Sequence, residues 1–268
     1  MKEYRIQDNA GNYAVILPEK GATVLKLVSN GVDVFYQNME NILSAERPRC
    51  GVPFLFPAFG RTQEDSSYPL PIHGFGHISE WTVMSYVENE LVLELNADAT
   101  TRKVYPFEFC VELRFLIKEG RLSIYQTYEN KDSRDMPYGF GFHPYFAVDP
   151  IEVETMVDAA LEMSRYTGQV LPFDKRPVRI EFPEGAAEGG TFFLQAKTGA
   201  VLHGKEKQIH IEFDENFDKL VFWAVVGKEF LCVEPINIMP NGLTTGDCYT
   251  LAPGEKREAC ISFYANKY

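Results

Sequence analysis

Three of the five histidines in this 268-residue chain lie in two short turns rich in glycine and aromatic residues. The first turn, residues 71–77 (PIHGFGH), contains His73 and His77, and the second, residues 139–146 (GFGFHPYF), contains His143. The unperturbed pKa of histidine lies close to neutral pH, so an imidazole can donate or accept a proton. Glycine and proline favour turns, and the neighbouring rings can form a pocket wall. The two turns are therefore candidates for acid–base chemistry.

Glu234 is the candidate carboxylate partner for these histidines. It follows the apolar run of residues 230–233 (FLCV) and precedes Pro235. A carboxylate in such a position is costly to remove from water unless it is paired or used in a reaction. A structural salt bridge is the alternative interpretation. If Glu234 and a histidine meet in one cleft, they supply the base and the acid of general acid–base catalysis.

A third unusual stretch is residues 51–61 (GVPFLFPAFGR). Its two prolines predict a rigid extended segment, and Gly60 predicts a turn just before Arg61. The forked donors of Arg61 suit hydroxyl or phosphate oxygens. An exposed arginine without such a role is the competing interpretation.

Apolar and polar residues alternate along much of the chain, which predicts strands with one buried face. The clearest segments are residues 91–95, 110–117, 122–128, 209–213, 220–226 and 259–264. Asn30-Gly31 predicts a tight hairpin turn between residues 24–28 and 32–36. Residues 157–166 fit a helix and a strand equally well, and residues 182–190 predict a surface loop. Many short strands with frequent turns predict one all-β domain over residues 1–268, a large antiparallel β-sandwich.

Composition restricts the partners and the compartment. The net charge is −12, from 26 basic and 38 acidic residues, so we expect neither nucleic acid nor an anionic membrane as a partner. The polar N-terminus lacks the apolar core of a signal peptide, and no apolar run approaches the length of a membrane span. The five cysteines are widely spaced without a C-x-x-C pair, which is typical of reduced thiols in a cytoplasmic protein.

The two Gly-Phe-Gly sequences, residues 74–76 and 139–141, do not predict a nucleotide-binding loop. Neither leads into a helix, and Pro144 interrupts the chain after the second. The sequence also lacks a P-loop lysine and a G-x-S-x-G elbow, so neither a phosphate-binding loop nor a serine hydrolase is expected.

A metal site is a further alternative. His73 and His77 are four residues apart, and His143 and Glu234 could add ligands. The glycines between the first two histidines oppose a helix, and the glutamate of an H-E-x-x-H motif is missing. We therefore expect no metal.

Taken in order, these stretches resemble the aldose 1-epimerase (mutarotase) family, near its bacterial mutarotase-like and hexose-6-phosphate mutarotase branch. The resemblance extends over about residues 10 to 265. It is carried by residues 51–57, 60–61, 73–75, 81, 143–146 and 232–235. It implies a single β-supersandwich, interconversion of the α and β anomers of an aldose, a monosaccharide substrate and no organic cofactor.

The resemblance also implies roles for individual residues. Glu234 would be the general base that takes the proton of the anomeric hydroxyl. His143 would be the general acid that protonates the ring oxygen. His73 would form a hydrogen bond to the sugar and stabilise charge near the reacting oxygens, and Arg61 would orient hydroxyls.

The remaining predicted site residues concern the choice of substrate. Phe75 and Tyr145 are candidates to stack on the apolar face of a sugar, and Trp223 fits either that role or the core. The hexose-6-phosphate branch usually reads His-Gly-Phe-Ala-Arg, whereas this chain has Gly76 and His77 at the last two positions. Losing that arginine removes a bidentate phosphate partner, so a free sugar is favoured and His77 becomes a substrate-binding candidate.

Several alternatives stay open at this stage. The chain could be a non-catalytic carbohydrate-binding protein on the same fold, or a hexose-6-phosphate mutarotase. A glycoside hydrolase would need a second acid facing Glu234, and a cupin-like enzyme would need a metal. The sequence leaves open the sugar, the oligomeric state and the family's additional carboxylate, for which Asp218 is only a candidate.

Overall fold

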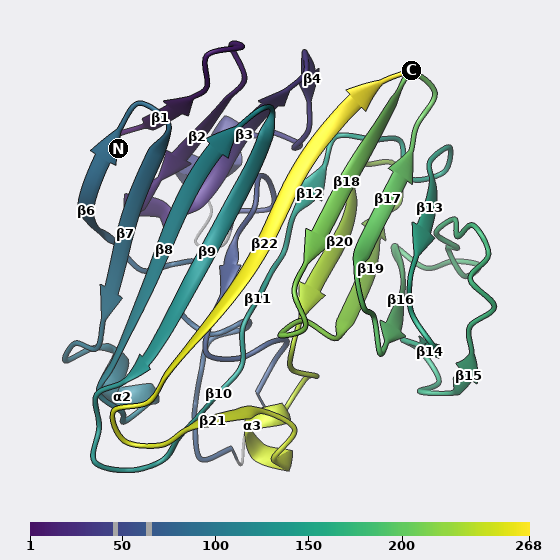
Figure 1. Cartoon of the computed structure of the whole chain (residues 1–268). Helices are drawn as coiled ribbons and strands as arrows, with labels where there is room; N and C mark the ends of the chain where they lie inside the picture. Colours follow the sequence, from purple (N-terminus) through teal and green to yellow (C-terminus); the bar gives the residue numbers. More distant parts are fainter. Residues whose placement is uncertain (45–47, 63–65) are drawn as a thin grey trace.

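The computed structural model describes residues 1–44, 48–62 and 66–268, and two antiparallel sheets of eight strands each dominate it (Figure 1). We call the first the long sheet. In spatial order it contains β13 (Glu154–Val157), β17 (Gly199–His203), β18 (Lys207–Phe213), β22 (Lys256–Lys267), β9 (Arg121–Asn130), β8 (Phe109–Lys118), β7 (Glu90–Asn96) and β6 (Thr82–Val87).

The second sheet carries the cavity described below, and we call it the site sheet. In spatial order it contains β15 (Val170–Pro172), β14 (Leu161–Ser164), β16 (Glu188–Leu194), β19 (Lys219–Val225), β20 (Leu231–Ile236), β11 (Gly141–Phe142) and β5 (Phe54–Leu55), and β12 (Tyr145–Phe146) also pairs with β20. The two sheets lie in separate layers (Figure 1). This arrangement confirms the large, all-β antiparallel sandwich that the sequence predicts.

Smaller elements complete the described chain. The strands are β1 (Tyr4–Gln7), β2 (Tyr13–Leu17), β3 (Thr23–Ser29) and β4 (Val32–Asp33), which form a four-stranded sheet, and β10 (Met136–Tyr138) and β21 (Tyr249–Leu251), which pair with each other. The helices are η1 (Pro18–Lys20), α1 (Met39–Ser44), α2 (Thr101–Val104) and α3 (Gly242–Thr245). In the described part of the chain, none of them is long and apolar enough to cross a membrane.

The strands follow the alternation of apolar residues. Buried and partly exposed side chains alternate from Val111 to Ile117 in β8, because successive side chains of a strand point to opposite faces of the sheet. The hairpin turn at Asn30-Gly31 is confirmed, since it joins β3 to β4 and both residues have positive φ, +51° and +73°. That combination is the one that a two-residue hairpin turn requires.

Two local predictions are decided by sheet pairing. The ambiguous residues 157–166 are not helical, because β13 pairs with β17 and β14 pairs with β16. The expectation of a surface loop over residues 182–190 is wrong at its end, since Glu188 begins β16 and pairs with Val225. Both assignments depend on hydrogen-bonding partner strands that lie elsewhere in the sequence. A short stretch of residues therefore cannot predict them by itself.

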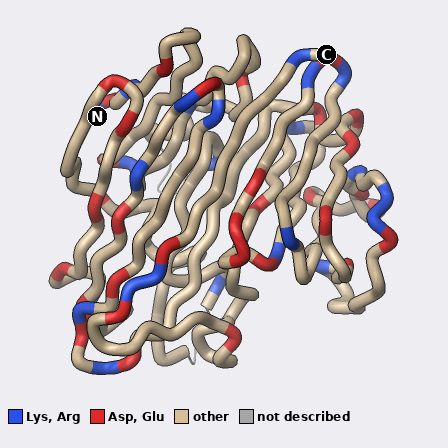
Figure 2. Tube along the Cα trace, viewed as in Figure 1, with Lys and Arg blue, Asp and Glu red and all other residues tan. Residues whose placement is uncertain are grey.

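Aromatic side chains fill much of the core between the sheets. Tyr128 and Phe140, for example, stack with their ring centres 4.5 Å apart, and both are fully buried. Acidic and basic residues are interspersed over strand ends and loops (Figure 2). All five cysteines fall within the described residues and none forms a disulfide. The apolar core thus fixes the two sheets on which the polar site is built.

Candidate active site

A cavity of about 400 Å³ opens over one face of the site sheet. Six of the seven site residues that the sequence predicts line it, and Phe75 does not. The lining residues are Pro48, Arg49, Pro53, Leu55, Phe59, Gly60, Arg61, Ile72, His73, His77, His143, Tyr145, Arg165, Glu188, Phe192, Val221, Trp223, Glu234 and Pro240. The residues carrying the candidate chemistry therefore share one enclosed space, although they come from distant parts of the sequence.

Strand register places His143 opposite Glu234. On one side of the pair, Gly141 of β11 is opposite Ile236 of β20. On the other, Tyr145 of β12 is opposite Cys232 of β20. Counting along both strands aligns residue 143 with residue 234, and side chains directly opposite each other emerge on the same face, about 5 Å apart at Cβ.

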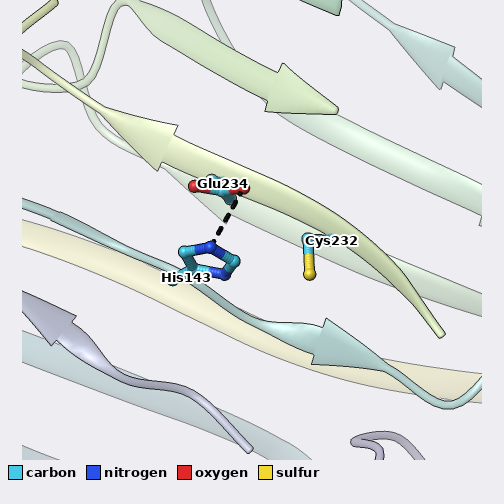
Figure 3. A group of neighbouring side chains, drawn as sticks. All are labelled: His143, Cys232 and Glu234. Carbon is cyan, nitrogen blue, oxygen red and sulfur yellow. Dashed lines mark ion pairs between the residues drawn. The ribbon is translucent and has the colours of Figure 1, made fainter. Parts of the chain in front are cut away.

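The two side chains both line the cavity, and they face each other in Figure 3. Nε2 of His143 lies 3.4 Å from Oε1 of Glu234, and the side chains are only 11% and 3% exposed. The backbone holds the histidine in this position, because its N–H donates to the carbonyl of Pro53 over 2.9 Å. An imidazole and a carboxylate side by side, largely shielded from water, can exchange protons with a ligand bound above them.

Burial controls the electrostatics of Glu234. Removal from water raises the pKa of its carboxyl well above the ordinary value, and the positive charge of Arg165 opposes that rise. Oε2 of Glu234 is buried and has no hydrogen-bond partner within the described residues. A carboxyl with a raised pKa is suited to act as a proton acceptor near neutral pH, and it keeps one oxygen for a ligand.

Aromatic rings enclose the His143 imidazole. The ring of Tyr145 stacks on it with centres 4.8 Å apart, and Trp223 contacts it edge-on at 5.7 Å. Tyr145 and Trp223 also pack against Phe230. These contacts restrict rotation of the imidazole, and Tyr145 and Trp223 present apolar surface to the cavity as well.

His73 lies beside His143 with its ring perpendicular, the centres being 5.4 Å apart. The N–H of Gly60 donates to Nδ1 of His73 over 3.1 Å. This bond requires an unprotonated Nδ1, so a neutral His73 carries its proton on Nε2. The backbone of His73 is in the left-handed region, with φ of +66°. Such strain at a non-glycine residue is common at functional sites.

The close approach of two segments fixes this turn. Phe56 and Gly74 form an isolated parallel bridge, and a Cβ at Gly74 would lie only 2.1 Å from the carbonyl oxygen of Phe56. Gly74 also has a positive φ of +71°. Only glycine satisfies both conditions, which explains why His73 is followed by glycine.

The remaining predicted residues occupy different places. His77 is buried and its ring centre lies 6.3 Å from that of His73, whereas Arg61 is exposed where it lines the cavity. Phe75 packs in the core against Phe56 and Phe109, at 5.8 and 5.7 Å between ring centres. The expectation that Phe75 faces a ligand is not met, because its ring points into the aromatic core between the sheets.

Sequence reasoning missed an acidic group on the cavity wall. The carboxylate of Glu188 accepts a hydrogen bond from Nε1 of Trp223 over 2.9 Å and forms an ion pair with Arg165 at 2.7 Å. Arg49 lies over the Trp223 ring, 5.6 Å from its centre. The candidate Asp218 is paired with Lys219 and is absent from the cavity lining.

Side chains that could hold a cation lie close together in this region, although they are not the His73 and His77 pair considered from the sequence. His143, Cys232 and Glu234 each offer a donor atom, and the three atoms lie within 4.8 Å of one another. All three residues are buried.

Comparisons with known proteins agree with the fold described above. The profile of the family described as aldose 1-epimerase matches residues 2–264. The uncharacterized protein YphB of Escherichia coli K12 is 23% identical over 224 residues, which are 71% of this chain and 70% of that protein.

Solved structures extend the likeness over the whole fold. The Slr1438 protein from Synechocystis sp. PCC 6803 has a TM-score of 0.89 at 25% identity, covering 100% of this chain and 96% of that one. A galactose mutarotase-like protein from Lactobacillus casei ATCC 334 has a TM-score of 0.83 at 20% identity, covering 99% and 100%.

Proposed function

Since the chain belongs to the aldose 1-epimerase family, we propose that it interconverts the α and β anomers of a free hexose or a related aldose. The observation that carries this proposal is the 3.4 Å separation of His143 Nε2 and Glu234 Oε1 in the cavity. Anomer exchange acts on two oxygens bonded to the same carbon, the C1 hydroxyl and the ring oxygen. An acid and a base that serve both must lie side by side.

In the proposed mechanism, the Glu234 carboxylate removes the proton of the C1 hydroxyl while protonated His143 donates a proton to the ring oxygen. The bond between C1 and the ring oxygen breaks and an open-chain aldehyde forms. Rotation about the C1–C2 bond presents the other face of the carbonyl, and the proton transfers reverse. General acid–base catalysis of this kind typically contributes about 10²–10⁴-fold in rate.

The other lining residues would bind the sugar. A neutral His73, with its proton on Nε2, can donate a hydrogen bond to a sugar oxygen close to His143. Tyr145 offers a ring surface, and Arg61 and His77 can contact hydroxyl groups. We assign these roles from their positions around the acid–base pair.

Glu188 is the additional carboxylate that we propose for sugar binding. Trp223 and Arg165 hold its side chain on the cavity wall. Carboxylate oxygens accept hydrogen bonds from hydroxyl groups, so Glu188 can orient a sugar without taking part in proton transfer.

A phosphorylated aldose is the second candidate substrate. Arg49 and Arg61 are exposed and line the same cavity, and guanidinium groups bind phosphate oxygens well. These two arginines favour this candidate, whereas His77 stands where the hexose-6-phosphate branch has arginine. We also propose a cytoplasmic location, because five unpaired cysteines fit a reducing compartment.

NMR exchange between anomers tests the proposal, with a panel of free hexoses and the same hexoses carrying a 6-phosphate. We expect acceleration by the parent protein and at least a ~10²-fold loss in Glu234→Gln, because the amide cannot accept the proton. Glu229→Gln, on an exposed turn, is the matched control and should keep the parent rate. A Glu234→Gln rate within about twofold of the parent refutes the assigned base. Saturable sugar binding without acceleration would support a carbohydrate-binding protein instead.

A further inference from the structure

Cys232 shares a face of the site sheet with the acid–base pair. It lies two residues before Glu234 on β20, and side chains two apart on a strand point the same way. Tyr145, on the same face as His143, is directly opposite Cys232. Figure 3 accordingly shows the sulfur of Cys232 beside His143 and Glu234. A thiol, an imidazole and a carboxylate thus converge in a buried position.

The distances are close to those of a tetrahedral zinc site. With bonds of about 2.0–2.1 Å, tetrahedral zinc holds a nitrogen and an oxygen ligand about 3.4 Å apart. His143 Nε2 and Glu234 Oε1 are already 3.4 Å apart. Donor atoms of all three residues lie within 4.8 Å of one another. A bound sulfur should lie about 3.6 Å from the other ligands, so the Cys232 sulfur has to approach them by no more than about 1.2 Å.

The donor chemistry selects the class of ion. A thiolate, an imidazole and a carboxylate suit zinc and similar borderline-soft cations, whereas magnesium and calcium prefer oxygen ligands alone. Glu234 Oε2 is buried without a hydrogen-bond partner among the described residues, so an acceptor oxygen is available to a cation. We propose that Cys232, His143 and Glu234 bind a zinc ion or a similar cation, and that its binding blocks the acid–base pair.

The binding step balances as a proton exchange. Burial raises the pKa of both the Cys232 thiol and the Glu234 carboxyl, so each group can hold a proton before the metal arrives. As zinc binds, the sulfur–hydrogen and oxygen–hydrogen bonds break, bonds from sulfur and oxygen to zinc form, and these protons pass to solvent. Zinc then occupies a lone pair of the His143 nitrogen and of a Glu234 oxygen, and neither group can move a proton to or from a sugar. This inhibition, unlike the binding, rests on the proposed function.

Cobalt binding tests the site without any need for sugar turnover. We expect the reduced, chelator-treated full chain to bind about one equivalent of Co²⁺ and to develop a thiolate-to-cobalt charge-transfer band. Cys232→Ala and Cys232→Ser should lose this band and bind at least about 10-fold more weakly. Cys260→Ala removes a half-buried thiol on the long sheet and should keep the band. No charge-transfer band in the parent, or a band that survives in both Cys232 variants, overturns the proposal.

Zinc inhibition provides the second readout. Zinc should displace cobalt and slow anomer exchange in the parent and in Cys260→Ala. Inhibition of Cys232→Ala, measured against the variant's own rate without zinc, should require at least about 10-fold more zinc than inhibition of the parent. Equal zinc sensitivity of the parent and Cys232→Ala contradicts the assigned thiolate. A parent that shows the cobalt band but no anomer exchange would contradict the proposed function and leave the metal site standing.

Discussion

Glu234→Gln should increase the stability of the protein, and the increase should grow with pH. The folded state buries the Glu234 carboxyl and raises its pKa above that of an unfolded chain, about 4.3. Because of the raised pKa, protonation of Glu234 stabilises the folded state. This contribution to the free energy of unfolding is fully present below the unfolded pKa and is lost as the pH rises through the folded pKa. Glutamine carries no charge at any of these pH values, so the variant does not suffer this loss.

The size of the effect follows from proton linkage. Between the two pKa values, the parent loses about 1.4 kcal/mol of unfolding free energy for each pH unit. For a chain of 268 residues, the entropy of unfolding is about 0.6 kcal/mol per kelvin. The difference in melting temperature between Glu234→Gln and the parent should therefore widen by about 2–3 °C per pH unit.

Thermal unfolding of both proteins, in half-unit steps of pH upwards from about pH 4.5, measures this difference directly, because the widening begins above the unfolded pKa and ends at the folded pKa. The exposed Glu229 provides the matched control, because its carboxylate stays in water when the chain folds. Glu229→Gln should follow the parent at every pH. A Glu234→Gln difference that is constant or narrows as pH rises would show that burial does not govern this carboxyl, and the reasoning would fail.

Two further predictions concern the cavity wall and the histidine turn. Glu188→Gln should raise the KM for anomer exchange by about 10-fold with little change in kcat. The substitution weakens sugar binding by about 1.4 kcal/mol and leaves the groups that transfer protons unchanged. Glu162→Gln loses the ion pair with Arg176, while its amide oxygen can still accept the hydrogen bond from the Thr191 hydroxyl, so both constants should stay unchanged. A fall in the Glu188→Gln kcat alone would contradict the assigned role. Gly74→Ala should lower the free energy of unfolding, measured by denaturant titration, by at least about 3 kcal/mol. The new Cβ would clash with the Phe56 carbonyl, and the positive φ at this position is unfavourable for alanine. Gly227→Ala has the same sign of φ and open space around it, so it should cost only about 1 kcal/mol, and equal losses would exclude the steric explanation.

Several elements were predictable from the sequence because their signals are local. Alternating apolar residues identified β8 and β9, and Asn30-Gly31 identified the turn between β3 and β4. The setting of Glu234, a carboxylate at the end of an apolar run, indicated a special role. Each of these patterns depends on a few consecutive residues and on backbone or solvation rules that hold in any fold.

Other features depend on pairing across the sheet and could not be predicted. The position of Glu188 on the cavity wall follows from its pairing with Val225, and its preceding residues resemble an ordinary loop. Phe75 is an aromatic residue in a glycine-rich turn, as expected for a residue lining a pocket. Its ring instead points into the core, where it packs against Phe109. Which face a side chain occupies depends on strand register, which the sequence specifies only through the completed core.

The alignment of β11 and β12 with β20 has a consequence for how the protein matures. Residues 143 and 234 are distant along the chain and share a surface only after the intervening strands have assembled. A chain still emerging from the ribosome, or one in which β20 has not yet paired, lacks the complete pair of His143 and Glu234 whatever other structure it has gained. Under the proposed function, anomer exchange can therefore begin only after these long-range strand pairs have formed.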